Sequence, residues 1–272
     1  MTKSSITPNK HALRLQTFWR RHGGTVLALA AIALFLAVWE IVAICVRREY
    51  MLPRFSAVAV AFVRLWGTYD FYRATGGTLV RSLVGFGLAF AGGFLLGVVG
   101  GVWPRFRAFL SPVVAFFRAA PTMGLALVIL VWLRARYTPV CIGFLMVFPI
   151  IYTTVADSIA HAPADLLQMA AVYHLPLAER VRSIYVPHAV PMVFSACSTA
   201  FALNIKATVS AEILAYTIGS VGMRMSLAAS DLLDGSALLF AWLIVAVLLS
   251  VLVEALLKGL QYLVMRRYRH AI

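Results

Sequence analysis

The chain has 272 residues, of which 62% are hydrophobic and 12% are charged, and its mean hydropathy is +0.90. About a quarter of the residues of a soluble domain are charged, so this composition excludes an ordinary soluble domain. The apolar residues form unbroken blocks, whereas strands of an outer-membrane barrel alternate over about 10 positions. The net charge of +14 comes from basic residues that mostly flank these blocks, which indicates membrane flanks and no nucleic-acid partner. We therefore expect an all-α polytopic membrane protein.

Six apolar blocks are long enough to cross a bilayer, which takes about 20 residues per helix. In chain order they cover residues 25–46, 79–102, 109–133, 139–156, 189–213 and 237–264. The first block follows a basic segment, residues 1–24, and precedes Arg47 and Arg48 instead of a small-residue cleavage site. We interpret it as a retained transmembrane helix and not as a signal peptide. Residues 47–78 are expected to be extracytoplasmic or interfacial, and residues 265–272 form a basic tail.

Six spans place both termini on the same side of the membrane. The basic, acid-free N-terminal segment and a small majority of the flanking basic residues favour cytoplasmic termini. The second block is rich in glycine, which lets helix backbones approach closely, so we expect it inside the bundle. The third block contains Pro112 and Pro121 and is expected to kink there.

The sequence carries no recognisable catalytic or metal-binding pattern. It has no phosphate loop, because no lysine follows a glycine. The aspartates fall at or outside the edges of the spans, which argues against a paired-aspartate protease. The cysteines form no ligand pair, and the spacings of His161, His174 and His188 match no zinc pattern. We therefore expect no enzyme activity, no metal and no cofactor in this chain, and transport with energy supplied by a partner.

A polar segment, residues 161–187, interrupts the apolar blocks before the fifth span. Asp165 can open a helix whose apolar stripe includes Ala170 and Ala171. Pro176 should stop that helix near His174 and begin a second one, which we expect to end at Pro187. The segment thus predicts a helix–turn–helix between two spans, which is either a generic amphipathic loop or a docking element.

This segment resembles the "EAA" coupling loop of permease subunits of binding-protein-dependent ABC importers. Gln168-Met169-Ala170 occupies the Glu-Ala-Ala positions, His174 the following glycine, and Val186-Pro187 the Leu-Pro. Further segments resemble the family in the same order along the chain: residues 51–60, 81–86, 118–122, 148–152 and 206–222. Several of these are typical of its nitrate/sulfonate/taurine-type branch. The resemblance covers about residues 50–265, with the permease core at 79–264.

The resemblance implies a type I importer permease in the inner membrane of a prokaryote. It implies two ATP-binding subunits that use ATP and Mg²⁺, an extracytoplasmic solute-binding protein, and a second copy of the permease, so that a homodimer lines the pathway. The substrate would be a small, anionic solute resembling nitrate, a sulfonate or taurine. The residues assigned to coupling are Asp165, Gln168, Met169, Ala170, Ala171, Tyr173, His174, Pro176, Glu179 and Pro187.

Two ionisable residues of the fifth span, Lys206 and Glu212, are candidates for the pathway, because charges at membrane depth face a partner or a water-filled cavity. They lie about 240° apart around an ideal helix, so we expect no direct ion pair. Lys206 either attracts an anionic substrate, pairs with a carboxylate of another helix, or extends its ammonium group toward the membrane interface.

Three other functions remain open from the sequence. A gradient-driven secondary transporter would show internal repeats and intramembrane carboxylates. The coupling subunit of a vitamin-uptake system also docks ATPases through helices, and a membrane scaffold would transport nothing.

Overall fold

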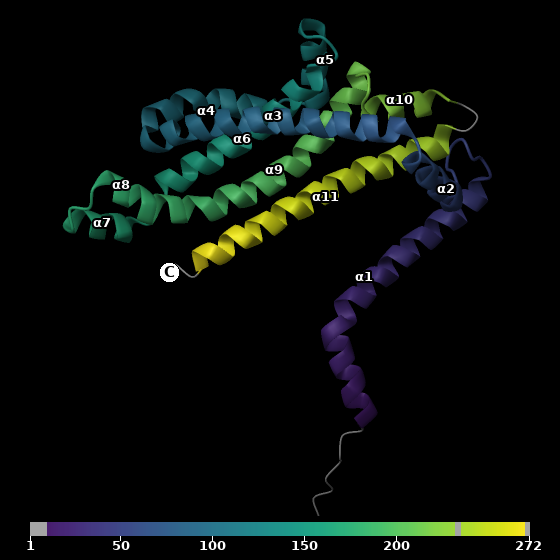
Figure 1. Ribbon diagram of the computed structural model, residues 1–272, viewed down its shortest axis with the longest axis horizontal. Helices are drawn as coiled ribbons and strands as arrows, with labels where there is room; N and C mark the ends of the chain where they lie inside the picture. The colour runs from purple at the N-terminus through teal and green to yellow at the C-terminus, as the bar shows by residue number, and fades with distance from the viewer. Residues whose placement is uncertain (1–9, 232–234, 270–272) are drawn as a thin grey trace, which may run out of the picture.

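The computed structural model describes residues 10–231 and 235–269, which fold into helices joined by short connections (Figure 1). The helices are α1 Lys10–Val46, α2 Phe55–Trp66, α3 Tyr69–Val102, α4 Pro104–Ala119, α5 Thr122–Trp132, α6 Thr138–Ala160, α7 Ala164–Val172, α8 Leu177–Arg180, a π-helical turn Val181–Tyr185, α9 Val186–Ala215, α10 Val221–Ser230 and α11 Gly235–Arg269. The expected all-α fold is confirmed. The expected end segments 1–24 and 265–272 lie partly outside the described residues.

Within the described residues, five helices are long and apolar enough to cross a membrane. The pair α4 and α5 makes a sixth crossing if it counts as one span, although the two helices meet at 102°. The prediction of one kinked third span was therefore wrong in one respect, because the span is broken into two helices. Pro112, where a kink was also expected, lies within α4. The break falls at Ala120 and Pro121, both extended, because proline keeps the preceding residue out of the helical region.

Helix α3 begins at Tyr69, well before the expected start of the second span. Thr68 supplies the N-cap, since its hydroxyl accepts a hydrogen bond from the amide of Phe71 at 3.3 Å. The segment expected to be extracytoplasmic therefore contains α2 and the first turns of α3.

Helices α3 and α6 pack in parallel through a seam of glycines. A Cβ added to Gly93 would lie 3.0 Å from Ile151, and one added to Gly97 would lie 2.8 Å from Val155. Inside lipid, close packing of this kind replaces the hydrophobic effect as the source of helix association. The expectation that the glycine-rich span lies in the bundle interior is confirmed.

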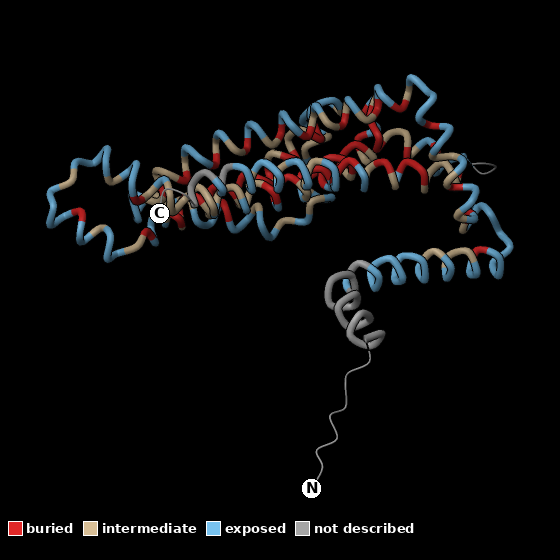
Figure 2. The backbone as a smooth tube through the Cα atoms, turned by 60° about the horizontal axis from the view of Figure 1, so that its bottom comes forward, coloured by how far each residue is buried: buried red, intermediate tan, exposed pale blue. Residues whose placement is uncertain are grey.

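Helix α9 runs between α6 and α11 and completes the bundle. Its Phe201 and Ile205 share a buried cluster with Trp242 of α11 and Phe71 of α3. Its Asn204 donates a hydrogen bond to the carbonyl of Ser82 at 2.7 Å, which ties α9 to α3 across the core. Figure 2 shows that the buried residues follow these central helices, whereas the part of α1 whose burial is described is largely exposed.

Helix α1 leaves the bundle (Figure 1), and the contacts described for it lie near its C-terminal end. There the indole of Trp39 donates to the carbonyl of Pro53 at 3.0 Å, and the carboxylate of Glu40 accepts from the amide of Phe55 at 2.8 Å. The two ends of the bundle differ. One carries α7, α8 and the C-terminal end of α11, and the other carries α2, α10 and the start of α3.

Candidate functional site

The predicted helix–turn–helix forms a hook at one end of the bundle (Figure 1). Helix α7 ends at Val172 and the next helix begins at Leu177, just after Pro176, as expected. The expected end at Pro187 was wrong, because the chain continues through the π-helical turn into α9. Pro187 sits in the first turn of α9, where a missing amide hydrogen costs little.

The turn after α7 is a Schellman motif with a histidine where glycine is usual. The amide of Leu175 donates to the carbonyl of Ala170 at 2.9 Å, and the amide of His174 donates to the carbonyl of Ala171 at 3.1 Å. His174 has a φ of 50°, in the left-handed region that glycine adopts without strain. His174 thus adopts the conformation that favours glycine, at the position where the loop that this segment resembles has glycine.

The side chains of the hook divide into an inner and an outer set. Ala170, on the apolar stripe of α7, is 0% exposed, so its side chain is covered by the chain itself and offers no surface to a partner. The outer surface consists of exposed apolar side chains, with Val172 at 74%, Tyr173 at 73% and Leu177 at 73%. The other coupling candidates, Asp165, Gln168, Met169, Ala171, His174, Pro176 and Glu179, are also exposed, on α7, on the turn or on α8.

Lys206 lies in a groove where the broken span meets α9. The groove has a volume of about 400 Å³ and is lined by Arg118 at the end of α4, Thr122 at the start of α5, and Lys206 and Ser210 of α9. Phe117, Met146 and Ile150 contribute apolar walls. We call this the cationic groove. The N-terminus of α5, at Thr122, adds the positive end of a helix dipole to the charges of Arg118 and Lys206.

A second hollow of about 450 Å³ shares Arg118 with the cationic groove. Arg107 lines it and forms an ion pair with Asp157 of α6. Thr153 also lines it and faces Arg118, whose guanidinium donates to the threonine hydroxyl at 3.5 Å. The two hollows place basic and hydroxyl side chains along one face of α4.

Glu212 lies in a different environment from Lys206. Its side chain is 0% exposed and forms a salt bridge with Arg81 of α3, with 3.0 Å between Nη1 and Oε1. The carboxylate also accepts from the hydroxyl of Thr78 at 2.8 Å and from the amide of Gly222 at 3.3 Å. The structure therefore separates the two pathway candidates. Lys206 lines an open groove, and Glu212 holds α3, α9 and α10 together.

The sequence interpretation missed Arg81 as a functional partner. Arg81 was grouped with the basic residues that flank the spans, although it lies just inside the expected block 79–102. In the structure Arg81 lies well inside α3, which begins at Tyr69. A charge inside a span demands a partner, so its place within the block was the signal that could have predicted one.

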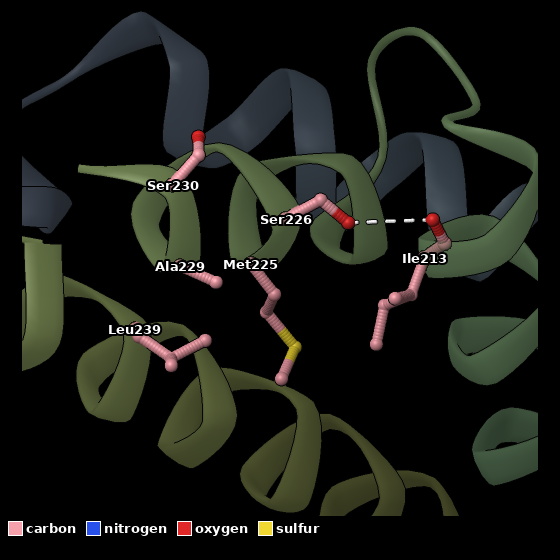
Figure 3. A pocket seen from close by; sticks show the side chains of 6 residues that line it. All are labelled: Ile213, Met225, Ser226, Ala229, Ser230 and Leu239. Carbon is pink, nitrogen blue, oxygen red and sulfur yellow. Dashed lines mark hydrogen bonds between the residues drawn. The ribbon is translucent and has the colours of Figure 1, made fainter.

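A third hollow lies between α10, α11 and the end of α9 (Figure 3). Met225, Leu239 and Ile213 point toward one another across it, and the hydroxyl of Ser226 donates to the carbonyl of Ile213 at 3.3 Å. Its lining residues carry no charge, so it does not suit an ionic solute. No group of histidine, cysteine or acidic residues able to hold a metal ion occurs within the part of the chain that the structure describes.

Comparison with known proteins gives the chain its family. Residues 89–270 match the family described as "Binding-protein-dependent transport system inner membrane component". The bicarbonate transport system permease protein CmpB of Synechococcus elongatus is 25% identical over 216 residues, covering 75% of this chain and 77% of the relative. The nitrate import permease protein NrtB of the same species is 26% identical over 201 residues, covering 68% and 70%.

The fold is also that of a solved transporter. A chain of the inward-facing MetNI methionine ABC transporter superposes with a TM-score of 0.59 at 15% identity, covering 74% of this chain and 97% of that chain. The family decides against a secondary transporter, a vitamin-uptake coupling subunit and a scaffold, and it assigns ATP hydrolysis to a separate subunit. This chain is a multi-pass inner-membrane protein that belongs to the permease subunits of binding-protein-dependent ABC importers.

Proposed function

We propose that this permease carries a small anion through the cationic groove. The proposal rests on one observation: the cationic side chains of Lys206 and Arg118 line the same groove, at the break between α4 and α5. Charges at membrane depth are costly, and they occur where a substrate or an opposite charge compensates them. Two relatives named for bicarbonate and nitrate support an anionic substrate.

The lining of the groove suits an oxoanion in particular. Thr122 and Ser210 supply hydroxyls beside the two cations, and the N-terminus of α5 supplies unpaired backbone amides. A competing role for Lys206 comes from Glu254 of α11, whose charge attracts it, although Glu254 already forms a 2.7 Å salt bridge with Lys258.

The exposed outer surface of the hook supports the docking role of α7 and α8. Two ATP-binding subunits would bind Val172, Tyr173 and Leu177, and nucleotide binding would move the hooks and switch the pathway between its two states. The working unit would be a homodimer served by an extracytoplasmic solute-binding protein. The α7–α8 end and both termini would then face the cytoplasm.

The test is ATP-driven uptake of labelled nitrate and bicarbonate by the complex reconstituted in proteoliposomes. Lys206→Gln and Arg118→Gln should each raise the KM for the transported anion by about tenfold, because each removes a charge-assisted contact. Lys206→Arg should restore most of the affinity. Arg64→Gln, on α2, is the matched control and should leave the KM unchanged.

A further variant separates the two roles of Lys206. If Lys206 serves only to pair with Glu254, then Glu254→Gln should reproduce the effect of Lys206→Gln. Under our proposal, Glu254→Gln leaves the KM close to that of the unaltered permease. Equal effects of the two substitutions would contradict a pathway role for Lys206.

A further inference from the structure

The end of the bundle opposite the hook contains a second basic cavity. It has a volume of about 530 Å³ and is lined by Arg73 and Arg81 of α3, Arg136 of the α5–α6 connection, and Thr217 and Ile218 of the α9–α10 connection. No carboxylate is among its lining residues. We call it the outer arginine pocket. Its size lies within the range of small-molecule sites, about 300–1,000 Å³.

Specific hydrogen bonds hold the walls of this pocket in place. The hydroxyl of Thr217 donates to the carbonyl of Ala135 at 2.9 Å, which joins the two connections. The guanidinium of Arg81 donates to the carbonyl of Ile218 at 2.9 Å and to the buried carboxylate of Glu212. The chain approaches α3 so closely that a Cβ on Gly77 would lie 2.3 Å from the carbonyl oxygen of Gly219. The pocket is therefore fixed by three elements and is not a chance gap between loops.

The charges of the pocket do not cancel. Arg81 is neutralised by Glu212, and the nearby Asp70 forms an ion pair with Arg224. Arg73 and Arg136 have no carboxylate partner within the part of the chain that the structure describes, and Arg136 instead lies 5.9 Å from the ring of Tyr137. Two uncompensated guanidiniums thus face a cavity that contains no acid, which concentrates anions there.

The position of these arginines is unusual for a membrane protein. Basic residues are normally enriched on the cytoplasmic side, yet this pocket is built from the N-terminal part of α3, which begins at the end opposite the hook, and from the connections that precede α6 and α10. Arg81 is accounted for by its salt bridge with Glu212, whereas neither topology nor an ion pair among the described residues accounts for Arg73 and Arg136, and ligand binding does. We propose that the outer arginine pocket is an anion-binding site that takes up a small oxoanion on the extracytoplasmic side, ahead of the cationic groove. The inference deepens the proposed function and rests on its orientation of the chain.

The binding test uses the full chain in nanodiscs, so it depends on neither transport nor orientation. Cys45, Cys141 and Cys197 are replaced by alanine, and a single thiol is introduced by Ile218→Cys in the pocket or by Ser56→Cys on the exposed surface of α2 as the control. Three methanethiosulfonate reagents serve as probes: a sulfonate, a quaternary ammonium and the neutral methyl compound. The ratio of the sulfonate to the ammonium rate reports the local potential and cancels differences in thiol reactivity.

The sulfonate-to-ammonium ratio should be at least about tenfold higher for Ile218→Cys than for Ser56→Cys. Arg73→Gln with Arg136→Gln should abolish the difference, and the corresponding lysine substitutions should preserve it. Sodium nitrate should slow the neutral reagent at Ile218→Cys in a saturable way. Sodium gluconate keeps the ionic strength constant, because screening of the arginines alters the thiolate fraction even when the reagent is neutral. Saturable protection by nitrate at constant ionic strength therefore reports occupancy.

Equal ratios at the two thiols would overturn the proposal. A high ratio without saturable protection by nitrate would also overturn it, since the pocket would then be a basic surface and not a binding site. Failure of the proposed function gives a different result. In that case nitrate would still protect Ile218→Cys in nanodiscs, while the reconstituted complex would show no ATP-driven anion uptake.

Discussion

Arg81 of α3 and Glu212 of α9 form a salt bridge across 131 positions of the chain, at a site where the glutamate is 0% exposed. The same carboxylate accepts hydrogen bonds from Thr78 and Gly222, so a single buried charge joins α3, α9 and α10. Removing one partner of such a pair leaves the other charge buried and uncompensated.

Arg81→Met should therefore lower the stability of the permease by about 3–5 kcal/mol. The thermal unfolding of the purified chain in nanodiscs, followed by circular dichroism, measures the change. Adding Glu212→Gln to Arg81→Met should recover part of the loss, because the uncompensated charge is then gone. Additive losses in the double variant would show that the two residues do not depend on each other.

The glycine seam between α3 and α6 gives a matched pair of substitutions. Gly97→Ala places a Cβ against Val155 and should lower stability by about 1–3 kcal/mol. Gly87 has open space on the same helix, so Gly87→Ala should be neutral or stabilising by up to about 1 kcal/mol, because alanine favours the helix. The same unfolding measurement compares them, and equal effects would contradict the close parallel packing.

The turn of the hook offers a test of backbone strain. His174→Gly should stabilise the turn by about 1 kcal/mol, because glycine adopts the positive φ freely. Hydrogen exchange at the amide of Leu175, which closes the Schellman motif, should become slower. Gln168→Gly, inside α7, is the control and should speed local exchange. Faster exchange in His174→Gly would mean that the histidine side chain itself holds the turn.

The two sides of the hook should respond differently to a charge. Tyr173→Glu changes an exposed side chain, so the hook should stay folded while retention of the ATPase during co-purification falls at least about tenfold. Ala170→Glu buries a charge inside the hook and should unfold it. Tyr173→Phe is the matched control and should retain the ATPase. Full retention and uptake in Tyr173→Glu would exclude this surface from docking.

Much of the architecture follows from hydropathy, because membrane spans need long apolar blocks whatever their partners. The block boundaries were less accurate. Asp70 and Arg73 interrupt the hydropathy at the start of α3, so its first turns were not recognised as part of the span. The break at Pro121 was expected only as a kink, because sequence spacing does not specify a bend of 102°.

In the candidate site too, features set by local sequence were predictable, and features set by packing between distant segments were not. The hook was predictable because its determinants are local: Pro176 sets the helix boundary, and His174 occupies the left-handed turn. The burial of Ala170 and the pairing of Arg81 with Glu212 depend on packing between segments far apart in sequence. The cationic groove was predicted only in part. Lys206 was expected to line the pathway, whereas Arg118 lies beside it because the α4–α5 span is broken.

The central claim is that this permease moves a small anion and that a separate ATPase drives it. The most direct measurement is uptake of labelled nitrate, bicarbonate and methylammonium into proteoliposomes that contain the permease with its ATPase and binding protein, with ATP or a non-hydrolysable analogue. We predict concentrative uptake of an anion with ATP alone, and no uptake of methylammonium. Anion uptake that persists without the ATPase, or preferential uptake of methylammonium, would contradict the account.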